Sequence, residues 1–142
     1  SPPCWRCAQM ATLTSMADPQ NVLVVVPDLM MRQKIVSALQ TLGYPARGVA
    51  KPARLPELLD QQQPAAILVE IDGVDIDGPE LIATIAADVR RHDAPVVGFC
   101  SHMRVDLMDA VRAAGADLVI ARGELVRRLG PVMAELIGPP AA

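Results

Sequence analysis

Four acidic side chains gather within residues 65–78 of this sequence, AAILVEIDGVDIDG. Glu70 follows the unbroken apolar run 66–69, and Asp72, Asp75 and Asp77 follow Glu70. Carboxylates spaced this closely could hold a cation, because hard divalent cations prefer oxygen ligands. An apolar run without polar alternation is typical of a strand covered on both faces. A strand leading into a loop and then a helix would place Glu70 at or near the carboxyl end of a central strand, where open α/β sheets build their sites.

A calcium loop of the EF-hand type is the most specific interpretation of these acids, but its pattern fails. Gly73 lies where the first ligand should be, and Thr84 lies where the last Glu should be. We expect instead a turn followed by a helix, with Asp77 as its N-cap. Asp72 or Asp75 could supply only a weak, opportunistic cation site, so we predict no dedicated metal.

The cysteines suggest two other kinds of chemistry. Cys100 and His102 are close enough in sequence for a Cys–His nucleophile, but no oxyanion motif or third partner accompanies them. We expect Cys100 to pack as a small apolar residue. Cys4 and Cys7 form a CxxC, yet a redox motif needs a strand before it and a helix after it, and zinc needs about four ligands. Neither context is evident, so we predict no enzyme activity and no disulfide framework.

Five apolar segments are predicted to be the strands that position these residues. The second segment is less apolar and contains Arg47, which suggests an edge strand. The predicted strands are 21–26, 45–50, 65–71, 94–100 and 117–121.

Helical periodicity separates these strands. Asp28 is a plausible N-cap for the first helix, and Gly43 ends it. Leu42 and Val89 are expected on buried stripes of their helices, and the pair at 130–131, Gly-Pro, should kink or divide the last helix. The predicted helices run from about 28 to 42, 55 to 62, 79 to 92, 104 to 114 and 124 to 137.

Strands that alternate with helices, joined by right-handed crossovers, leave few arrangements. We predict an α/β fold of the flavodoxin-like type. It would be a doubly wound, five-stranded parallel sheet in the order 2-1-3-4-5, with five helices. The predicted organisation is a flexible N-terminal tail (1–20), one domain (21–138) and a Pro/Ala-rich C-terminal tail (139–142).

Composition excludes several functions. The net charge is −3 and the arginines are scattered, which argues against direct nucleic-acid binding. No apolar run reaches the roughly 18 residues that span a membrane, and no signal peptide is recognisable, so we expect a cytoplasmic protein without membrane contact. The chain has no GxGxxG, no P-loop and only three aromatic residues, so we expect neither a nucleotide nor a flavin cofactor.

Local motifs give a more specific expectation. Over residues 21–137 the chain resembles the receiver domain of bacterial two-component response regulators. Each match is weak alone, but their order and spacing together are fairly specific. The matching motifs are VLVV at 22–25, LGY at 42–44, DG at 77–78 with EL at 80–81, PVV at 95–97 and AGAD at 114–117.

The resemblance implies a phosphorylation site that this chain has largely lost. Receivers carry a phosphoryl-accepting Asp at the end of the third strand, and the matching residue here is Glu70. They bind magnesium through an acidic pair after the first strand. The residues that match this pair are Val26 and Pro27, with Asp28 one place further on. Val26 and Pro27 offer no side-chain oxygen, although magnesium needs about one or two carboxylates.

The residues that respond to phosphorylation in receivers are replaced as well. The Thr or Ser that ends the fourth strand corresponds to Cys100, with Ser101 beside it. The aromatic switch residue of the fifth strand corresponds to Val119, and the family's lysine corresponds to Arg122. Arg122 could pair bidentately with Glu70, or the two could remain separate solvated charges.

We therefore interpret the chain as a receiver-like signalling module, acting through a protein partner and without Asp phosphorylation. Two alternatives remain. One is a conventional receiver in which Asp28 or Asp72 restores metal binding. The other is a small ligand-binding domain or enzyme on the same fold. Receivers commonly pair through their fourth helix, fifth strand and fifth helix, which implies a weak homodimer or a partner surface here, presenting Met108, Arg112, Arg127 and Arg128.

Overall fold

The structure is a computed structural model, and it describes residues 20–102 and 104–140. Its centre is one parallel sheet with strands in the order β2-β1-β3-β4-β5, as the sequence predicted. The strands are β1 (Val22–Val25), β2 (Ala46–Val49), β3 (Ala66–Glu70), β4 (Val96–Cys100) and β5 (Leu118–Ala121). The Cys4–Cys7 motif, for which we predicted no function, and most of the predicted N-terminal tail lie outside the described residues.

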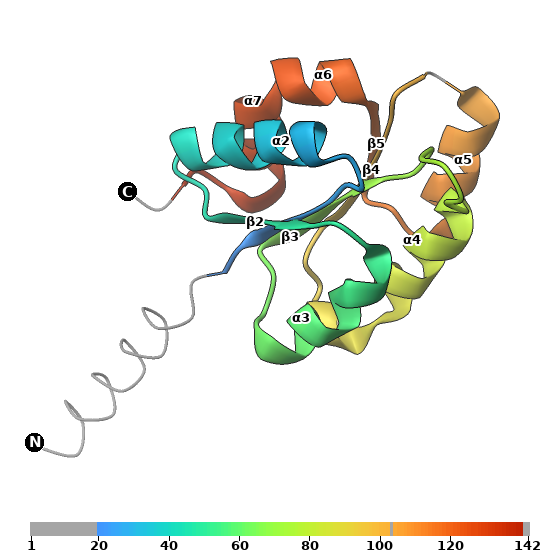
Figure 1. Cartoon of the computed structure of the whole chain (residues 1–142), viewed down its shortest axis with the longest axis horizontal. Coiled ribbons are helices and arrows are strands. Elements are labelled where there is room, and N and C mark those ends of the chain that lie inside the picture. The colour runs from blue at the N-terminus through green and yellow to red at the C-terminus, as the bar shows by residue number, and fades with distance from the viewer. Residues whose placement is uncertain (1–19, 103, 141–142) are drawn as a thin grey trace, which may run out of the picture.

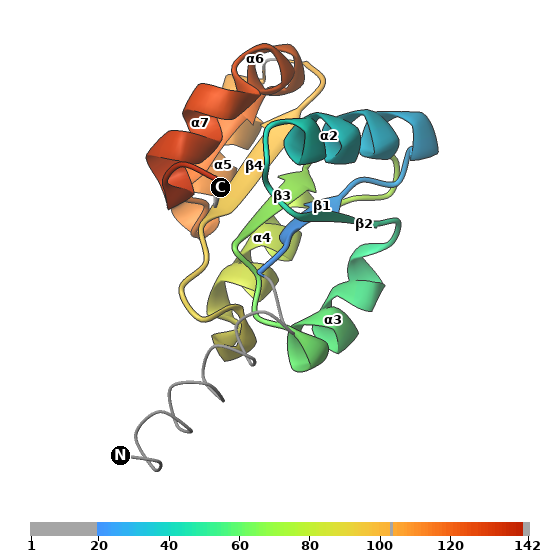
Figure 2. The same ribbon diagram turned by 90° about the vertical axis from the view of Figure 1, so that its left-hand side faces the viewer.

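Helices cover both faces of the sheet (Figure 1). One face carries α2 (Leu29–Thr41), α6 (Arg122–Arg127) and α7 (Leu129–Ile137), and the other carries α3 (Leu55–Gln61), α4 (Gly78–Ala87) and α5 (Val105–Ala114). Figure 2 shows the same two layers from the side. Two short 3₁₀ turns, η1 (Pro52–Arg54) and η2 (Val89–Arg91), precede α3 and follow α4. None of the helices that the structure describes is long and apolar enough to cross a membrane.

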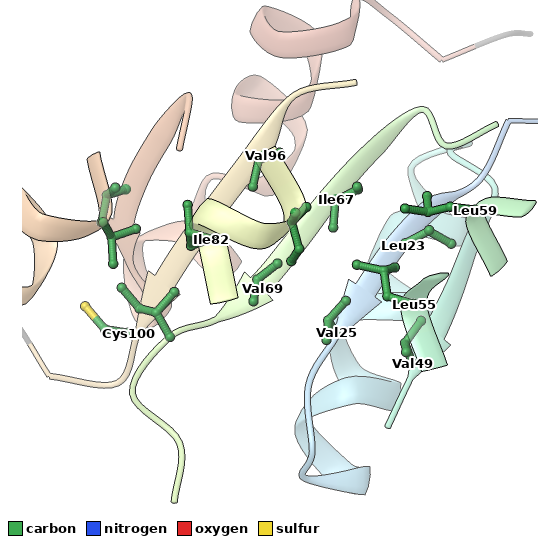
Figure 3. Packing of buried hydrophobic residues seen from close by; sticks show 14 of the residues in the cluster. Leu23, Val25, Val49, Leu55, Leu59, Ile67, Val69, Ile82, Val96 and Cys100 are labelled. Carbon is green, nitrogen blue, oxygen red and sulfur yellow. The ribbon is translucent and has the colours of Figure 1, made fainter. Parts of the chain in front are cut away.

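The alternation of side chains along each strand divides the core into two layers. Leu23 and Val25 of β1 face α3, α4 and α5, and Figure 3 shows part of this layer. Val22 and Val24 face α2, α6 and α7. Because both faces are covered, β1 and β4 are buried along their whole length, which explains why their sequences are unbroken apolar runs.

One helix ends well before its predicted end, and two residues expected on buried helical stripes are exposed. The predicted helix 79–92 stops at Ala87, because Asp88 has an extended backbone (ψ 116°) and its side chain accepts a hydrogen bond from the backbone N–H of Arg90 (2.9 Å), which starts η2. Val89 consequently points to solvent and is 86% exposed, so its predicted burial was wrong. Leu42, just past the end of α2, is 40% exposed, and its expected burial was also wrong.

The last predicted helix is divided. The break lies at Arg128 (φ −115°, ψ 29°), and Gly130 and Pro131 fall in the first turn of α7, where a proline needs no intrahelical donor. The described residues therefore contain six α-helices where five were predicted. After α7 the chain returns to the turn that follows α2, where the hydroxyl of buried Tyr44 donates to the carbonyl of Gly138 (2.9 Å).

Hydrogen bonds and ion pairs of side chains stabilise the amino edge of the sheet, where the strands begin. The carboxylate of Asp117 accepts from the backbone N–H of Val96 (2.8 Å). Arg90 joins Asp88 (2.7 Å) to Asp60 at the end of α3 (3.0 Å), and it thereby ties α3 to η2. This pairing lowers the pKa of the Asp88 carboxyl below its ordinary value of 3.8.

Candidate functional site

The candidate site lies at the carboxyl edge of the sheet, where the loops after β1, β3 and β4 meet. After β1, Val26 is fully buried, and Pro27 is exposed. The guanidinium of Arg32, on α2, donates to the carbonyls of Val26 (2.8 Å) and Pro27 (3.1 Å). The end of β1 therefore offers no side-chain carboxylate from residues 26 and 27, and a fixed positive charge lies against it.

The side chain of Arg32 passes over Gly48 of β2 to reach the carbonyls of Val26 and Pro27. A Cβ on Gly48 would come within 2.8 Å of the Cδ of Arg32, so the missing side chain at Gly48 makes room for the arginine. Asp28 is also in use, because its carboxylate accepts from the backbone N–H of Met31 (2.9 Å) as the N-cap of α2, as predicted. That engagement weakens the alternative in which Asp28 replaces the acidic pair of a receiver.

Glu70 ends β3 and is partly buried. Burial raises the pKa of its carboxyl above the ordinary value of 4.5, and the negative charges of Asp72 and Asp28 raise this pKa further. The positive charge of Arg122 acts in the opposite direction but does not outweigh burial. Glu70 is thus a carboxylate whose surroundings disfavour its charge.

Arg122, the first residue of α6, does not form a bidentate pair with Glu70, which was one of the two arrangements that the sequence left open. Although the structure describes both side chains, no ion pair within 4.0 Å joins Glu70 and Arg122. Instead, Oε2 of Glu70 lies on the side of the following loop, 3.6 Å from where a Cβ of Gly73 would be. Of the two arrangements that the sequence left open, the structure shows the separated charges.

Asp72 joins the loops after β3 and β4. Its Oδ2 accepts from the hydroxyl of Ser101 (2.8 Å) and from the backbone N–H of Ser101 (2.9 Å). Its Oδ1 is buried and has no hydrogen-bond partner among the described residues. The sequence did not predict this link. The two residues are 29 positions apart, so no spacing pattern connects them.

Cys100 is fully buried at the end of β4. Burial raises the pKa of its thiol, and the negative charge of Asp72 raises it further, so the reactive thiolate is disfavoured. His102 is exposed, whereas Cys100 lies in the core layer under α4 and α5. Cys100 therefore has the environment of the packed apolar residue that we expected, rather than that of a nucleophile.

The acidic loop after β3 is a turn with an N-cap. The carboxylate of Asp77 accepts from the backbone N–H of Glu80 (3.2 Å), which confirms the predicted cap of α4. A Cβ on Gly78 would lie 2.6 Å from the carbonyl oxygen of Ile71, so only glycine allows this close approach. Within the described ranges, no three His, Cys, Asp or Glu side chains are grouped so that they could hold a metal ion.

The expected interaction face lies on α5, β5 and α6. Val119 is buried, and Met108 is also buried at 7% exposure, so Met108 cannot present itself on this face as we expected. Met108 packs inward because it lies on the apolar stripe of α5 with Val111. Arg112, Arg127 and Arg128 are exposed. Arg112 pairs with Asp109 of α5, and both Arg127 and Arg128 pair with Glu124 of α6.

Two contacts of the candidate site were therefore missed from sequence: Arg32 with the carbonyls of Val26 and Pro27, and Ser101 with Asp72. The position of Arg32, one helical turn after the Asp28 cap, was the only available signal for the first. The sequence around Asp72 suggests only a weak cation ligand, so it gave no signal for the second.

No family model and no curated protein matches the sequence. The fold, however, is similar to many solved structures. Chemotaxis protein CheY4 of Vibrio cholerae aligns with 82% of this chain and 98% of its own at 15% identity and a TM-score of 0.73. A CheY-like receiver domain protein of Methanospirillum hungatei JF-1 aligns with 82% of this chain and 95% of its own, at 17% identity and a TM-score of 0.67.

A response regulator of Burkholderia pseudomallei, whose structure holds a phosphorylated aspartic acid and a calcium ion, aligns with 82% of this chain and 66% of its own, at 20% identity and a TM-score of 0.70. These similarities agree with the strand order, the two helical layers and the loops that meet at the carboxyl edge. The chain therefore has the CheY-like fold of response-regulator receiver domains.

Proposed function

We propose that this chain is a receiver-like signalling module that acts through protein–protein interaction and does not receive a phosphoryl group at position 70. The observation that carries the proposal is the end of β1. There Val26 and Pro27 supply no carboxylate, and the guanidinium of Arg32 donates to both carbonyls. A divalent cation at this place would be repelled by the guanidinium and would lack hard oxygen ligands.

The other parts of the site support the same proposal. Phosphoryl transfer depends on metal and fixed cations that neutralise the charge on the equatorial oxygens. The surroundings of Glu70 already disfavour negative charge, because burial and the neighbouring charge of Asp72 both raise the pKa of its carboxyl. The phosphorylated aspartic acid and the calcium ion belong to the Burkholderia pseudomallei structure. Among residues 20–102 and 104–140 of this chain, no three His, Cys, Asp or Glu side chains are grouped so that they could hold a metal ion, which supports the proposal.

The test is treatment of the whole protein with a small-molecule phosphodonor, with and without magnesium, followed by intact-mass measurement. We expect no gain of mass. Glu70→Asp alone should also take no label, because it restores the acceptor but not the metal ligands. Magnesium-dependent labelling of the unchanged protein at a carboxylate near Glu70 would overturn the proposal.

A restored site provides the positive counterpart. Val26→Asp and Pro27→Asp together with Glu70→Asp should supply metal ligands, and magnesium should raise the melting temperature of this triple mutant. Without magnesium the triple mutant should be less stable than the parent, because Val26 is fully buried and the carboxylates repel one another. Adding Arg32→Met should strengthen the response to magnesium, since it removes the opposing charge.

The exposed arginines of α5 and α6 support a surface for a weak homodimer or a protein partner. Arg112, Arg127 and Arg128 lie on the elements through which receivers pair, although neighbouring acids partly neutralise them. Light scattering at rising concentration tests the homodimer. We expect weak association that Arg127→Glu reduces. A strict monomer that is indifferent to this mutation would contradict the homodimer.

A further inference from the structure

A groove lies on the α3–α4 side of the molecule. Its volume is about 570 Å³, and its walls come from the segments after β1, β2 and β3 and from α4. Apolar side chains form most of its lining: Pro27, Ala50, Pro52, Ala53, Pro56, Val74, Ile76 and Leu81. We call this hollow the α3–α4 groove.

A smaller pit of about 50 Å³ adjoins the groove and shares Pro52, Pro56, Leu81 and Thr84 with it. The pit reaches Leu55, Leu59 and Ile85, which belong to the buried core layer under α3, α4 and α5. An open groove that leads to a narrow apolar pit matches the way a peptide lies in a groove and anchors one apolar side chain.

The loop after β3 presents an apolar residue at the groove. Val74 lines it and is 89% exposed, and the next residue, Asp75, has a left-handed backbone (φ 61°). Non-glycine residues adopt this conformation at a cost, although Asp tolerates it better than most. The turn thus holds a valine toward solvent at the rim, where it could contact a partner.

The charges around the groove indicate what kind of segment fits. Of its four titratable lining residues, Asp75, Asp77 and Glu80 are acidic and only Lys51 is basic. None of these three acids joins an ion pair within 4.0 Å in residues 20–102 and 104–140. An apolar segment with Lys or Arg beside its anchor would complement this rim.

We propose that the α3–α4 groove is a docking site for a partner protein's amphipathic segment, which places an apolar side chain over the pit and basic side chains against Asp75, Asp77 and Glu80. The inference rests on the proposed interaction function and gives it a second surface, with a defined partner chemistry. The groove lacks aromatic side chains and is mainly apolar, which favours a peptide over a stacked planar ligand.

The first experiment uses random peptides of about 12 residues displayed on phage and selected against the whole protein. We expect the selected peptides to be enriched in Leu, Ile or Met together with Lys or Arg. A synthetic copy of one such peptide, titrated into isotopically labelled protein, should shift the amide signals of residues 50–56 and 74–84. Weaker binding at higher salt is expected for an acidic rim.

Matched mutants on α4 distinguish the groove from a general effect of charge. Thr84→Arg places a bulky cation in the groove and near Glu80, and it should lower peptide affinity by about tenfold or more. The control is Ala83→Arg. Ala83 is exposed on the same helix but does not line the groove, so this substitution should leave peptide affinity unchanged. Equal loss in both mutants, or none in Thr84→Arg, would overturn the inference.

A second pair of mutants tests the acidic rim. Asp75→Asn with Glu80→Gln should weaken the peptide by about fivefold at low salt. The control, Asp93→Asn with Glu135→Gln, changes an exposed left-handed Asp (φ 62°) and an exposed helical Glu outside the groove, and it should have no effect.

The other outcomes each count against the groove. Selected peptides that are acidic, or that shift only α5 and α6, would overturn it while leaving the proposed interaction function intact. Shifts of residues 50–56 and 74–84 that depend on protein concentration alone would identify a second copy of this chain as the occupant. Phosphodonor labelling is measured separately, so failure of the groove and failure of the proposed function are distinguishable.

Discussion

The charged side chains at the two edges of the sheet differ in whether they have bonding partners. At the amino edge, Asp117 accepts from Val96, and Arg90 joins Asp88 to Asp60, so every one of these charges has a partner. At the carboxyl edge, the charge of Glu70 is disfavoured, and Oδ1 of Asp72 is buried without a hydrogen-bond partner in the described chain. Unsatisfied polar groups cost stability and concentrate at functional sites. The amino edge therefore serves mainly to stabilise the fold, and the carboxyl edge has the electrostatic features of a functional surface.

The largest expected effect tests whether the carboxyl edge is tightly packed despite its unsatisfied charges. Gly78→Ala should destabilise the protein by about 1–3 kcal/mol, because its Cβ would collide with the carbonyl of Ile71, which cannot move independently of β3. Chemical denaturation measures the change. Gly123→Ala, at the same edge with nothing within 4 Å of its Cβ, is the control and should be neutral or stabilising. Similar losses in both variants would show that the close approach at Gly78 is unimportant.

The next effect concerns the amino edge. Asp117→Ala should cost about 1–2 kcal/mol, because the backbone N–H of Val96, at the start of a buried strand, loses its acceptor. Asp109→Ala removes an exposed acid whose ion-pair partner among the described residues is Arg112, and it should cost much less. If the two substitutions cost the same in urea denaturation, the amino edge would not have the stabilising role described above.

The pH dependence of stability should have opposite signs for Asp88 at the amino edge and Glu70 at the carboxyl edge. The lowered pKa of Asp88 means that its charge stabilises the fold above its ordinary pKa of 3.8, and that this contribution is lost as the pH falls through the lower folded value. Asp88→Asn should therefore lower the melting temperature at neutral pH, and its difference from the parent should shrink under strongly acidic conditions. A difference that is constant with pH would contradict this role of the Arg90 pairing.

Glu70 should show the opposite sign and the smallest effect. Its pKa is raised, so its charge destabilises the fold above the folded pKa, and this penalty disappears as the pH falls toward the ordinary value of 4.5. Glu70→Gln should raise stability at neutral pH, by less than about 1 kcal/mol because solvent screens the site. This gain in stability should vanish on acidification. Thermal melts at several pH values measure it, with Glu135→Gln, a change at an exposed position, as the control. A loss of stability in Glu70→Gln would mean that Arg122 outweighs burial.

The sequence predicted what short-range rules determine. Unbroken apolar runs predicted the five strands, and the caps at Asp28 and Asp77 followed from residue type and position. Val89 was misplaced because a helical pattern continues through Asp88, whereas the Asp88 side chain bonds the backbone locally and ends α4. Met108 was misplaced because the resemblance named the elements of a face, and only the packing shows which side of α5 faces outward.

The contacts of the candidate site were harder to predict. Arg32 reaches the carbonyls of Val26 and Pro27 past Gly48, a residue of another strand that has no side chain to obstruct it. The bond from Ser101 to Asp72 depends on how two loops meet after the sheet has formed. Such contacts between a side chain and a distant loop have no period and no fixed spacing, so motif comparison could suggest positions for the site but not the hydrogen bonds within it.

The bond between Tyr44 and Gly138 also bears on how the chain folds. These residues are 94 positions apart, so the bond closes nearly the whole domain into one loop. Contacts of such separation are slow to form, because loop entropy must be lost before they contribute energy. During synthesis, the early strands could pair while the hydroxyl of Tyr44 still awaited the end of α7. Tyr44 is the only tyrosine of the sequence, so its fluorescence, measured in a Trp5→Phe variant that removes the tryptophan signal, would report this closing step in a refolding experiment.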